Sequence, residues 1–390
     1  MKALVIAPQP FFSPRGTPFS VYYRTMITAQ FDVQIDLLTY GEGQDVDIPG
    51  VRIIRIPRFA RLGKVSIGPS YLKLFLDFFV ILWTVGLLLR NRYNFVHAHE
   101  EAVFFCRFLK PLFGFKLVYD MHSSLPQQLT NFKFTSSKLL INTFRKLEDS
   151  CLRAADAVIT ICPDLANYVD KHISSREKHL LIENSIFEPV KLAAASNSPS
   201  RRPQEPLPSL PSNKKLLVYA GTLEPYQGID LLLEAFQKVL PKDEQTFLLI
   251  AGGNEKQVLE YRVRAEQLGL SEHCLFTGRV SQAAAKQYSA AATVLLSPRS
   301  SGTNTPLKIY EQLASGIPLV ATRIYSHTQV LTDDVAILVN PDPSSMADGM
   351  LKALSPLAQK IAVKAQKLYQ EKYSRVAYET KMRNLLDLLS

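Results

Sequence analysis

The stretch SPRSSGTNTPLKIYEQLASGIPLVAT, residues 297–322, is the most informative segment for the fold class. It follows an apolar run, residues 294–296, with the composition of a buried strand, and it ends in a second apolar run, residues 318–321. Between them lie a loop of small polar residues and the helix-forming sequence LKIYEQLAS. Pro306 marks the start of this helix and Gly316 its end. The pattern predicts a strand–loop–helix–strand unit of a parallel sheet.

The polar loop has the features of an anion site. Residues 300–305 bring backbone N–H groups to a helix N-terminus, where the helix dipole favours negative charge. Lys308 lies in the first helical turn and Arg299 just ahead of the loop, so a diphosphate would fit without a metal. One turn further on, the Glu311 carboxylate could accept the two vicinal hydroxyls of a ribose. An ordinary capped helix with a surface glutamate is the structural alternative.

The segment resembles the donor site of the GT-B nucleotide-sugar glycosyltransferases, in particular retaining glycosyltransferase family 4. That family has Glu-x7-Glu across this loop and helix, followed by a small residue, glycine, proline and an apolar strand. Glu311 matches the second Glu, whereas Thr303 stands at the position of the first. The resemblance implies that Glu311 holds the ribose and that loop amides hold the phosphates, with Thr303 or Asn304 near the transferred sugar. The donor residues expected in this segment are Arg299, Gly302, Thr303, Asn304, Thr305, Leu307, Lys308 and Glu311.

Length and composition indicate an ordinary globular protein. The 390 residues suffice for two or three domains, and 47% are hydrophobic and 21% charged. The four scattered cysteines show no zinc spacing, so we expect buried, reduced thiols. The apolar run at residues 3–7 predicts a first strand rather than a leader, and a cytoplasmic location follows as the expectation.

The formal charge of +10 is concentrated near an apolar segment. Between residues 51 and 76 there are six cations and no acid, and residues 78–89, FFVILWTVGLLL, carry no charge. Twelve uncharged residues are too few to span a bilayer, which needs roughly 20. A buried helix is the first interpretation, and a helix partly sunk in an anionic membrane surface beside a basic patch is the second. No nucleic-acid-binding module is recognisable.

Strand-like and helix-like segments alternate along the chain. Strands are expected at residues 3–7, 33–39, 51–56, 95–97, 116–120, 157–161 and 180–182, with helices at 18–30, 70–89 and 139–154. The Pro- and Ser-rich stretch 191–213 has the composition of a linker. A second α/β series then runs from residue 214 to 373. We therefore expect two Rossmann-like doubly wound domains facing a cleft, the GT-B arrangement. Their predicted limits are 1–190 and 214–373, and a C-terminal helix, 374–390, packs back on the first domain.

Ligands of open parallel sheets gather beyond the carboxyl ends of the strands, which ranks the loops of the first domain. The loop after the first strand contains Arg15, Gly16 and Thr17, and it resembles the family's first glycine-containing loop, which meets donor phosphate and acceptor. His122 follows the strand at 116–120, where a family histidine bonds the transferred sugar. His99 and Glu100, in the sequence HAHEE at 97–101, are expected on the acceptor side. The two histidines of that sequence only faintly suggest a metal, because the sequence identifies no third ligand.

In the second domain, YAGTL at 219–223 and GID at 228–230 resemble the family's G-R-L…K-G segment, whose Arg and Lys clamp the diphosphate. Gly221 matches its glycine, but Thr222 and Gln227 replace the two cations. Arg299 and Lys308 would then carry the counter-charge. Arg279, after a strand that begins at residue 274, falls where the family contacts the base. The DxD-like Asp45-Val46-Asp47 lies far in sequence from the donor segment, so we expect no metal.

The function expected from this resemblance is hexosyl transfer, with retention and without a metal or other cofactor. The donor would be a UDP- or GDP-linked sugar, and the acceptor a hydroxyl of a glycan or a lipid-linked molecule. The apolar, basic first domain suggests peripheral contact with an anionic membrane, on the inner face of the cytoplasmic membrane. A nucleotide-sugar epimerase of the same fold and a non-catalytic binding or scaffold protein remain as alternatives.

Overall fold

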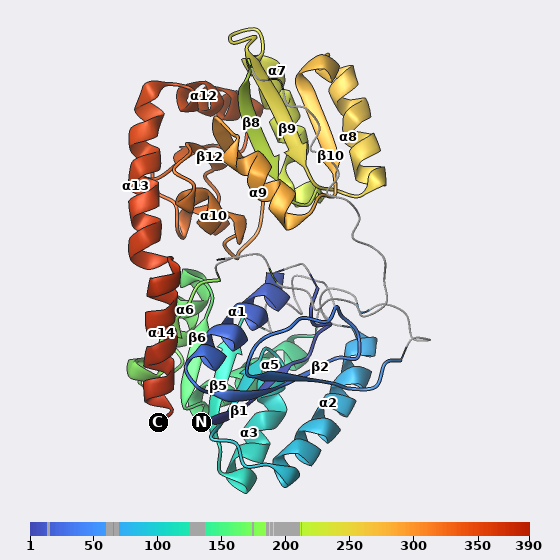
Figure 1. Cartoon of the computed structure of the whole chain (residues 1–390), viewed down its shortest axis with the longest axis vertical. Coiled ribbons are helices and arrows are strands. Elements are labelled where there is room, and N and C mark those ends of the chain that lie inside the picture. Colours follow the sequence, from blue (N-terminus) through green and yellow to red (C-terminus); the bar gives the residue numbers. More distant parts are fainter. Residues whose placement is uncertain are drawn as a thin grey trace. The chain divides into compact units, whose positions relative to one another are not determined.

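The computed structural model describes residues 1–13, 16–59, 65, 70–124, 137–173, 175–184, 187, 190, 211 and 213–390. The chain divides into two compact units (Figure 1). Met1–Asn197 and Arg375–Ser390 form the N-terminal unit, and Ser198–Ser374 form the C-terminal unit. The predicted linker lies almost entirely outside the described residues, and Arg15 lies outside them too.

A parallel sheet of seven strands forms the centre of the N-terminal unit, in the order β3-β2-β1-β4-β5-β6-β7. Because helices cover both faces, its central strands are continuous apolar runs rather than alternating ones. The chain proceeds to one side of β1 through β2 and β3 and to the other side from β4 onwards. The carboxyl ends of β1 and β4 therefore form the switch point where ligands bind in such sheets. The strands are β1 (Lys2–Ala7), β2 (Gln34–Thr39), β3 (Val51–Arg55), β4 (Phe95–His99), β5 (Lys116–Met121), β6 (Ala157–Thr160) and β7 (His179–Leu181).

Alternate residues of β1 point into two separate cores of this unit. Ala3 and Val5 contact helices α1 (Gly16–Gln30) and α14 (Arg375–Leu388) on one face of the sheet. Leu4 and Ile6 belong to the core of the other face, with α2 (Tyr71–Arg90), α3 (Ala102–Phe113), α5 (Lys138–Ala154) and α6 (Pro163–Asp170). A 3₁₀ turn, η2 (Arg176–Lys178), precedes β7. The tail helix α14 thus completes the core of the N-terminal unit.

The C-terminal unit repeats this plan with six parallel strands, in the order β10-β9-β8-β11-β12-β13. Its switch point lies at the carboxyl ends of β8 and β11. The strands are β8 (Lys215–Ala220), β9 (Thr246–Ala251), β10 (Cys274–Gly278), β11 (Val294–Ser297), β12 (Leu319–Thr322) and β13 (Ile337–Val339). One face is covered by α7 (Ile229–Val239), α8 (Glu255–Gln267) and α12 (Pro343–Ala353), the other by α9 (Gln282–Ala290), α10 (Lys308–Ala314) and α13 (Pro356–Lys372). Short elements are η3 (Pro225–Gln227), η4 (Ser271–His273) and α11 (Tyr325–Thr328).

The structure confirms the two doubly wound α/β units, and most predicted elements begin and end within two residues of the observed ones. The sequence did not predict helices α3, α6 and α12 or strand β13. Each of these helices contains a proline, Pro111 inside α3 and Pro163 and Pro343 at the first turns of the other two. Proline is compatible with a first turn, but it weakens a helical pattern when the sequence is considered alone. The expectation of buried thiols holds for Cys106, Cys151 and Cys162, while Cys274 is half-buried.

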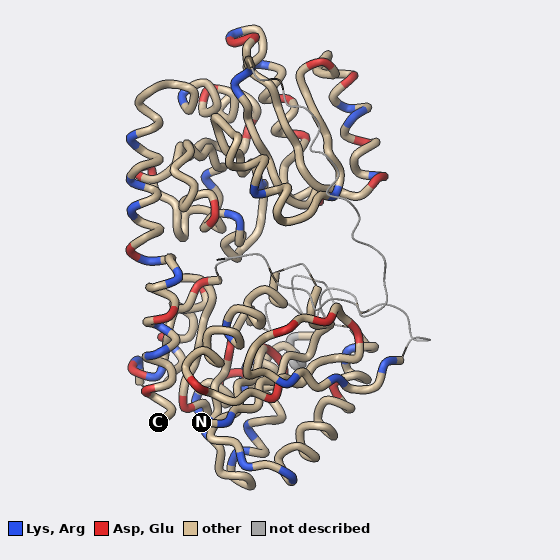
Figure 2. Tube along the Cα trace, viewed as in Figure 1, with Lys and Arg blue, Asp and Glu red and all other residues tan. Residues whose placement is uncertain are grey.

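Helix α2 corrects the interpretation as a buried helix. Only Leu76, Val80, Thr84 and Leu88 are buried, and the side that faces away from the sheet is exposed. By length and composition this 20-residue helix could cross a bilayer, and it is the one such helix among the described residues. The twelve uncharged residues 78–89 are only part of this helix, which also includes residues 71–77 and Arg90. Most of α2 carries neither charge colour in Figure 2.

Two cations of the predicted basic patch form ion pairs, whereas Arg58 is exposed. Arg52 pairs with Asp36 at 2.8 Å, and Arg55 pairs with Asp45 at 3.0 Å and binds loop carbonyls. Arg61 and Lys64 lie outside the described residues. The DxD-like segment therefore contributes Asp45 to an ion pair.

Candidate functional site

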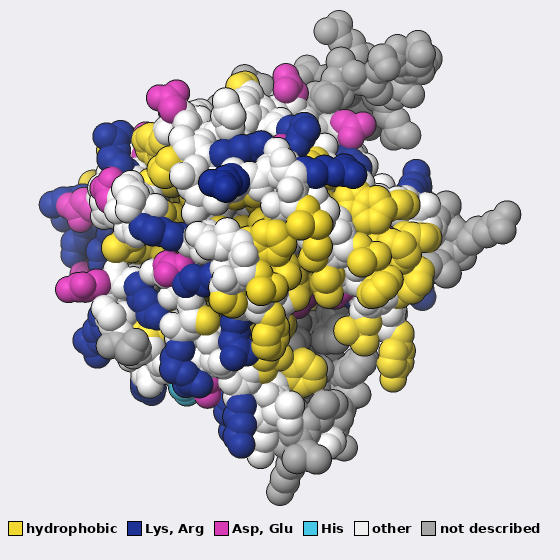
Figure 3. Space-filling view, turned by 90° about the horizontal axis from the view of Figure 1, so that it is seen from below, with side chains coloured by type: hydrophobic (Ala, Val, Ile, Leu, Met, Phe, Trp, Pro, Cys, Tyr) yellow, Lys and Arg dark blue, Asp and Glu magenta, His cyan; other side chains and the backbone are white. Residues whose placement is uncertain are grey.

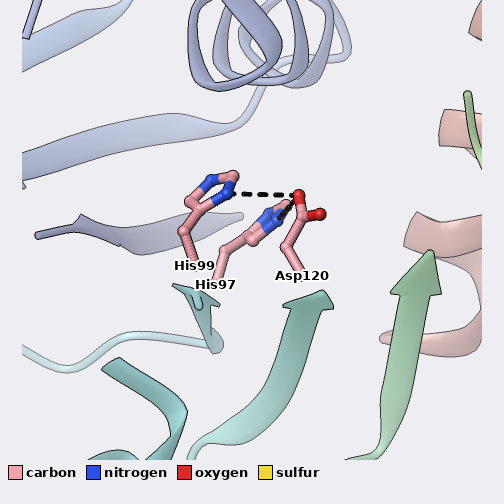
Figure 4. Close-up of side chains that lie close together, drawn as sticks. All are labelled: His97, His99 and Asp120. Atoms are coloured by element: carbon pink, nitrogen blue, oxygen red, sulfur yellow. Dashed lines mark hydrogen bonds and ion pairs between the residues drawn. The ribbon is translucent and has the colours of Figure 1, made fainter. Parts of the chain in front are cut away.

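Four polar side chains converge on Asp120 at the carboxyl ends of β4 and β5. Alternation along β4 puts His97 and His99 on one face, and the sheet register places His99 opposite Asp120 (Figure 4). The Asp120 Oδ2 atom lies 2.9 Å from His97 Nε2, 3.3 Å from His99 Nδ1 and 2.7 Å from Arg24 Nε. His122 Nε2 lies 3.3 Å from Asp120 Oδ1 and 3.1 Å from His99 Nδ1. The structure therefore joins the predicted His99 and His122 through a carboxylate that the sequence analysis did not select.

Arg24 makes this buried carboxylate an anion. Burial raises the pKa of Asp120, but Arg24 and the histidines lower it more, so the net pKa lies well below its usual range. Burial, opposed by Asp120, lowers the pKa of His122 to about 4 and that of His99 well below its ordinary value. Near neutral pH, His122 is therefore a neutral imidazole beside a charged carboxylate, and it can exchange hydrogen bonds without carrying charge.

His97, His99 and Asp120 also form a group of three potential metal ligands. The sequence showed the two histidines but did not identify Asp120 as the third ligand. One ligand atom from each lies within 4.8 Å of the others. Their geometry is compatible with a metal, but the chemistry of the set disfavours one: the Arg24 guanidinium already forms an ion pair with Asp120, with Nε 2.7 Å from Oδ2. A cation at that oxygen would face the guanidinium charge and would have to displace it. Arg24 thus supplies the positive charge that a metal would otherwise bring.

An acidic group adjoins these histidines at the start of α3. Glu100 has a left-handed backbone, φ 49°, and its N–H donates to the Asp120 carbonyl at 3.0 Å. The charge of Lys73 acts on Glu100 and Glu101, and Tyr40 donates to Asp77 at 2.5 Å. Burial and the Glu101 charge raise the pKa values of Glu100 and Asp77 to about 7. We call Asp77, Glu100 and Glu101, together with the neighbouring cation Lys73, the acidic group.

The remaining predicted residues of the N-terminal unit lie at the start of α1. Gly16 and Thr17 are its first two residues, and among the described residues none beyond the chain neighbours would come within 4 Å of a Cβ at Gly16. Asp120 and Arg24 were not predicted from the sequence, although each left a signal there. Asp120 is two residues before His122, and Arg24 is the one charged residue of a 15-residue helix. A buried charge requires a partner.

Lys308 is the central cation of the C-terminal unit. It begins α10, at the carboxyl ends of β8 and β11, and its Nζ is buried with no hydrogen-bond partner among the described residues. The ammonium lies 4.0 Å from the centre of the Tyr219 ring, and a Cβ on Gly221 would lie 3.6 Å from it. Burial, reinforced by the charge of Arg299, lowers the pKa of Lys308 to about 7. A buried cation without an anionic partner fits an anionic ligand.

Arg299 was expected to provide positive charge for a diphosphate, but in the structure its guanidinium binds carbonyls of its own loop. Its guanidinium donates to the Ser301 and Asn304 carbonyls at 2.6 and 3.3 Å, and it lies 5.1 Å from the centre of the Tyr226 ring. Gly302 has φ 132°, a backbone conformation that residues with a Cβ rarely adopt, so glycine is favoured there. Desolvation lowers the pKa of Arg299. Of the two predicted cations, Arg299 is committed to loop structure in this state.

A network below the loop was not anticipated. His327 is fully buried, 3.0 Å from Ser297 Oγ and 2.8 Å from the Thr322 carbonyl, and the Thr322 hydroxyl donates to the Arg299 carbonyl. Burial lowers the pKa of His327 to about 4, so a neutral imidazole joins the ends of β11 and β12. His327 thus fixes the strand ends beside the predicted donor loop.

Thr222 and Gln227, the uncharged residues at the positions of the family's Arg and Lys, lie close together in the structure. Gln227 donates to Thr222 Oγ1 at 3.4 Å, and the Thr222 carbonyl accepts from Tyr219 at 2.6 Å. Gly228, with φ 74°, is close to the donor loop: an added Cβ would lie 2.1 Å from the Pro298 carbonyl oxygen. Arg279 is exposed, directly after β10.

The other donor-segment residues surround Lys308. α10 begins at Lys308, and Leu307 is its N-cap. Pro306 therefore precedes the helix by two residues, whereas the sequence predicted it at the first helical position. Gly316 follows the helix with φ 70°, as expected. Thr303 and Glu311 are exposed, Asn304 is half-buried, and the Thr305 hydroxyl is buried. Glu311 lies on the outer side of α10, opposite Ile309 and Leu313.

Two family models match the chain, one in each unit. A glycosyl transferase 4-like domain matches residues 24–185, and the glycosyl transferases group 1 model matches residues 201–368. A phosphatidyl-myo-inositol mannosyltransferase of Mycobacterium leprae is 32% identical over 162 residues. That alignment covers 40% of this chain and 41% of the relative, so it spans less than half of either protein.

Solved structures agree with these matches over the whole chain. Sucrose-phosphate synthase from Thermosynechococcus elongatus has a TM-score of 0.73 at 19% identity, covering 100% of this chain and 98% of that one. Anabaena HepE in complex with UDP has a TM-score of 0.71 at 16% identity, covering 99% and 100%. The two parallel sheets therefore define the GT-B class. The chain belongs to the GT-B glycosyltransferases and resembles family 4, with a 4-like N-terminal half and a group 1 C-terminal half.

Proposed function

We propose that this chain transfers a hexose from a nucleoside diphosphate to a hydroxyl acceptor, with retention of the anomeric configuration and without a metal. The observation that carries the proposal is the buried Lys308 ammonium, which lacks a hydrogen-bond partner among the described residues. Such a group is costly unless a ligand anion pairs with it. We assign donor binding to the C-terminal unit and acceptor binding to the N-terminal unit.

Departure of the nucleoside diphosphate leaves negative charge on its oxygens while positive charge builds on the sugar ring. A prepositioned cation and backbone amides stabilise that leaving group without reorganising. In our proposal Lys308 and the backbone N–H groups of residues 302–305 and 307 do this, and the Glu311 carboxylate accepts hydrogen bonds from the ribose hydroxyls. Arg299 shapes the loop through the carbonyls of Ser301 and Asn304. Loss of Lys308 should therefore affect donor binding more than loop structure.

In the N-terminal unit we assign the transferred sugar to His122. Its neutral imidazole, held by Asp120, can hydrogen-bond a sugar hydroxyl without placing charge beside the cationic ring of the transition state. The acidic group would accept hydroxyls of the acceptor. Gly16 and Thr17, at the start of α1, would adjoin donor phosphate and acceptor. We name no enzyme nucleophile.

The relatives favour particular substrates without fixing them. Anabaena HepE was solved with UDP and with UDP-glucose, and the Mycobacterium leprae relative is by name a mannosyltransferase acting on phosphatidyl-myo-inositol. We propose a UDP- or GDP-linked hexose as donor and a glycan or lipid-linked hydroxyl as acceptor. We also propose a cytoplasmic enzyme, peripheral on the inner face of the cytoplasmic membrane.

The test is calorimetric titration with UDP and with GDP in the presence of EDTA, followed by a transfer assay with the preferred nucleotide sugar. We expect one nucleotide to bind with a micromolar Kd, and NMR to show retained configuration in the product. No binding of either nucleotide at millimolar concentration would favour a scaffold protein. Release of an altered free sugar without an acceptor would favour an epimerase.

A further inference from the structure

Helix α2 has an unusual distribution of charge. Its buried residues recur every four positions from Leu76 to Leu88, so they form one stripe against the sheet. The opposite side is apolar, with Leu74 62% exposed and Phe78 57% exposed. The two charged residues before Arg90, Lys73 and Asp77, lie on the inner side, where Asp77 bonds Tyr40. A soluble surface helix normally shows the reverse pattern.

Helix α3 continues this outer surface. Phe108 and Leu112 are exposed, and the C-terminal ends of α2 and α3 both line a hollow of about 440 Å³. Figure 3 shows hydrophobic side chains gathered over this side of the N-terminal unit, with Lys and Arg side chains along part of the border. Contiguous exposed apolar area of this kind marks an interaction site. We define the α2–α3 face as Leu74, Phe75, Phe78, Leu82, Leu89, Phe108 and Leu112.

The charges beside the face are positive. Arg90 and Arg92 are exposed at the end of α2, and Arg107 of α3 lies 4.8 Å from the centre of the Phe108 ring. Neither α3 nor the connection at residues 91–94 contains an acid. An apolar face bordered by cations is complementary to an anionic bilayer surface, which attracts cations close to it.

We propose that the α2–α3 face docks on an anionic bilayer with α2 lying in the plane of its surface. Although α2 is long enough to cross a membrane, its inner stripe belongs to the same core as Tyr40, Tyr93 and Val96. Inserting the helix across the bilayer would remove Leu76, Val80 and Leu88 from that core. Lying in the surface, α2 keeps this packing and still buries its outer side in the acyl boundary.

A second copy of the chain is the competing occupant. A two-fold contact brings the same patch of both copies together, so Arg90 and Arg92 of each copy would enclose one dry interface. Their charges would repel each other there, whereas anionic lipid attracts them. The bilayer is therefore the better match to the charges present.

Docking also places the acidic group one helix diameter, roughly 10 Å, from the lipid boundary, because Lys73 and Asp77 lie on the inner side of the same turns of α2 whose outer side carries Leu74 and Phe78. We infer an amphiphilic acceptor, with its apolar chain along α2 and a hydroxylated head at Lys73, Asp77 and Glu100. This second step rests on the proposed glycosyl transfer. The docking step does not, since it needs neither donor nor chemistry.

The experiment measures co-flotation of the full chain with vesicles of phosphatidylcholine alone and with 30% phosphatidylglycerol, at about 0.1 M salt. We expect binding mainly to the anionic vesicles. The triple variant Leu74→Ser/Phe78→Ser/Leu82→Ser should bind at least tenfold less, and Arg90→Ser/Arg92→Ser should bind severalfold less. The matched control is Leu259→Ser/Val263→Ser/Leu357→Ser, which removes exposed apolar side chains of the C-terminal unit. Thermal melting checks that each variant is folded.

Equal binding to both kinds of vesicle, or equal binding by the triple variant and wild type, would overturn the docking proposal. The proposal would also be overturned if sedimentation velocity showed a stable wild-type dimer and a monomeric triple variant, and if the wild type did not bind vesicles. UDP titration of the same variants keeps the two proposals apart. Unchanged UDP affinity with lost flotation supports docking, and flotation without any UDP or GDP affinity would refute only the enzyme.

Discussion

The Arg24 guanidinium lies 2.7 Å from the Asp120 carboxylate inside the N-terminal unit, and both side chains are at most 1% exposed. Arg24 also donates to the Ile182 carbonyl at 2.9 Å, so it ties α1 to the end of β7. Because Asp120 contacts three histidines, this one ion pair sets the charge of the predicted acceptor side. The fold and the site are therefore coupled through Arg24.

Replacing Arg24 should lower the free energy of unfolding. Arg24→Met leaves Asp120 buried without its cation, and breaking a buried pair in this way costs about 3–5 kcal/mol. Urea denaturation of wild type and variant measures the difference. Lys364→Met, which breaks the exposed pair with Asp334, is the control and should change stability by less than about 1 kcal/mol. Equal effects of the two substitutions would show that the Arg24 pair is not important for stability.

His122→Asn tests the sugar contact. We expect sugar transfer to fall by about 10²–10⁴-fold, the usual contribution of a positioned proton-transfer or hydrogen-bonding group. UDP or GDP affinity should stay within twofold, because the proposed nucleotide site lies in the other unit. His172→Asn, in a half-exposed loop, is the control. A parallel loss of nucleotide binding would contradict the division of roles between the two units.

Lys308→Met should weaken nucleotide binding at least tenfold, since the diphosphate loses its buried cation. Wild-type affinity should itself depend on pH. The pKa of Lys308 is about 7 in the free protein, so above pH 7 the ammonium loses its proton before the anion binds. Calorimetry from pH 6 to 9 should therefore show falling affinity for wild type and a flatter profile for Lys308→Met. Lys360→Met, on the exposed side of α13, should behave as wild type.

Glu311→Ala separates ribose binding from phosphate binding. We expect the UDP or GDP affinity to fall about tenfold, in line with the loss of hydrogen bonds to a charged acceptor. Affinity for inorganic pyrophosphate should remain, because that ligand has no ribose. If the variant binds both ligands as wild type does, Glu311 is an ordinary surface glutamate.

Asp77→Asn should change the pH dependence of stability. Burial and the Glu101 charge raise the pKa of Asp77 to about 7, whereas an unfolded aspartate ionises near pH 4. Between these values only the folded state keeps the proton, so the contribution of Asp77 to stability falls as pH rises. The variant should therefore gain about 1–3 kcal/mol relative to wild type between pH 4 and 8. A difference that stays constant across this range, or that also appears for the exposed Asp333→Asn, would contradict the assignment.

Much of the fold could be predicted from local pattern. Apolar runs separated by helical segments gave two parallel sheets, and residues 297–322 gave the strand–loop–helix–strand unit around Lys308 with Gly316 at its end. Helices interrupted by proline, such as α3, could not be predicted because a proline removes the regularity that identifies a helix.

The site was predictable only in part. The rule that ligands gather at carboxyl ends of strands ranked the loops of His99 and His122, and the choice of His122 rests mainly on the resemblance to the family. Asp120 and Arg24 required the strand register and the packing of α1 on the sheet. Arg299 was selected as a free cation, yet it holds the carbonyls of its own loop. Local sequence does not show which acceptor a long side chain reaches.

The sequence by itself determined the alternation of strands and helices, the family, and the strand–loop–helix–strand unit that carries the proposed donor loop, because these depend on residue periodicity and short motifs. Tertiary structure alone decided which charges are paired and which surface stays uncovered. Arg24 acquires its role from a carboxylate 96 positions away, and α2 turns Lys73 and Asp77 inward and its leucines and phenylalanines outward. Electrostatic energy and burial depend on distance in space, which the order of residues does not specify.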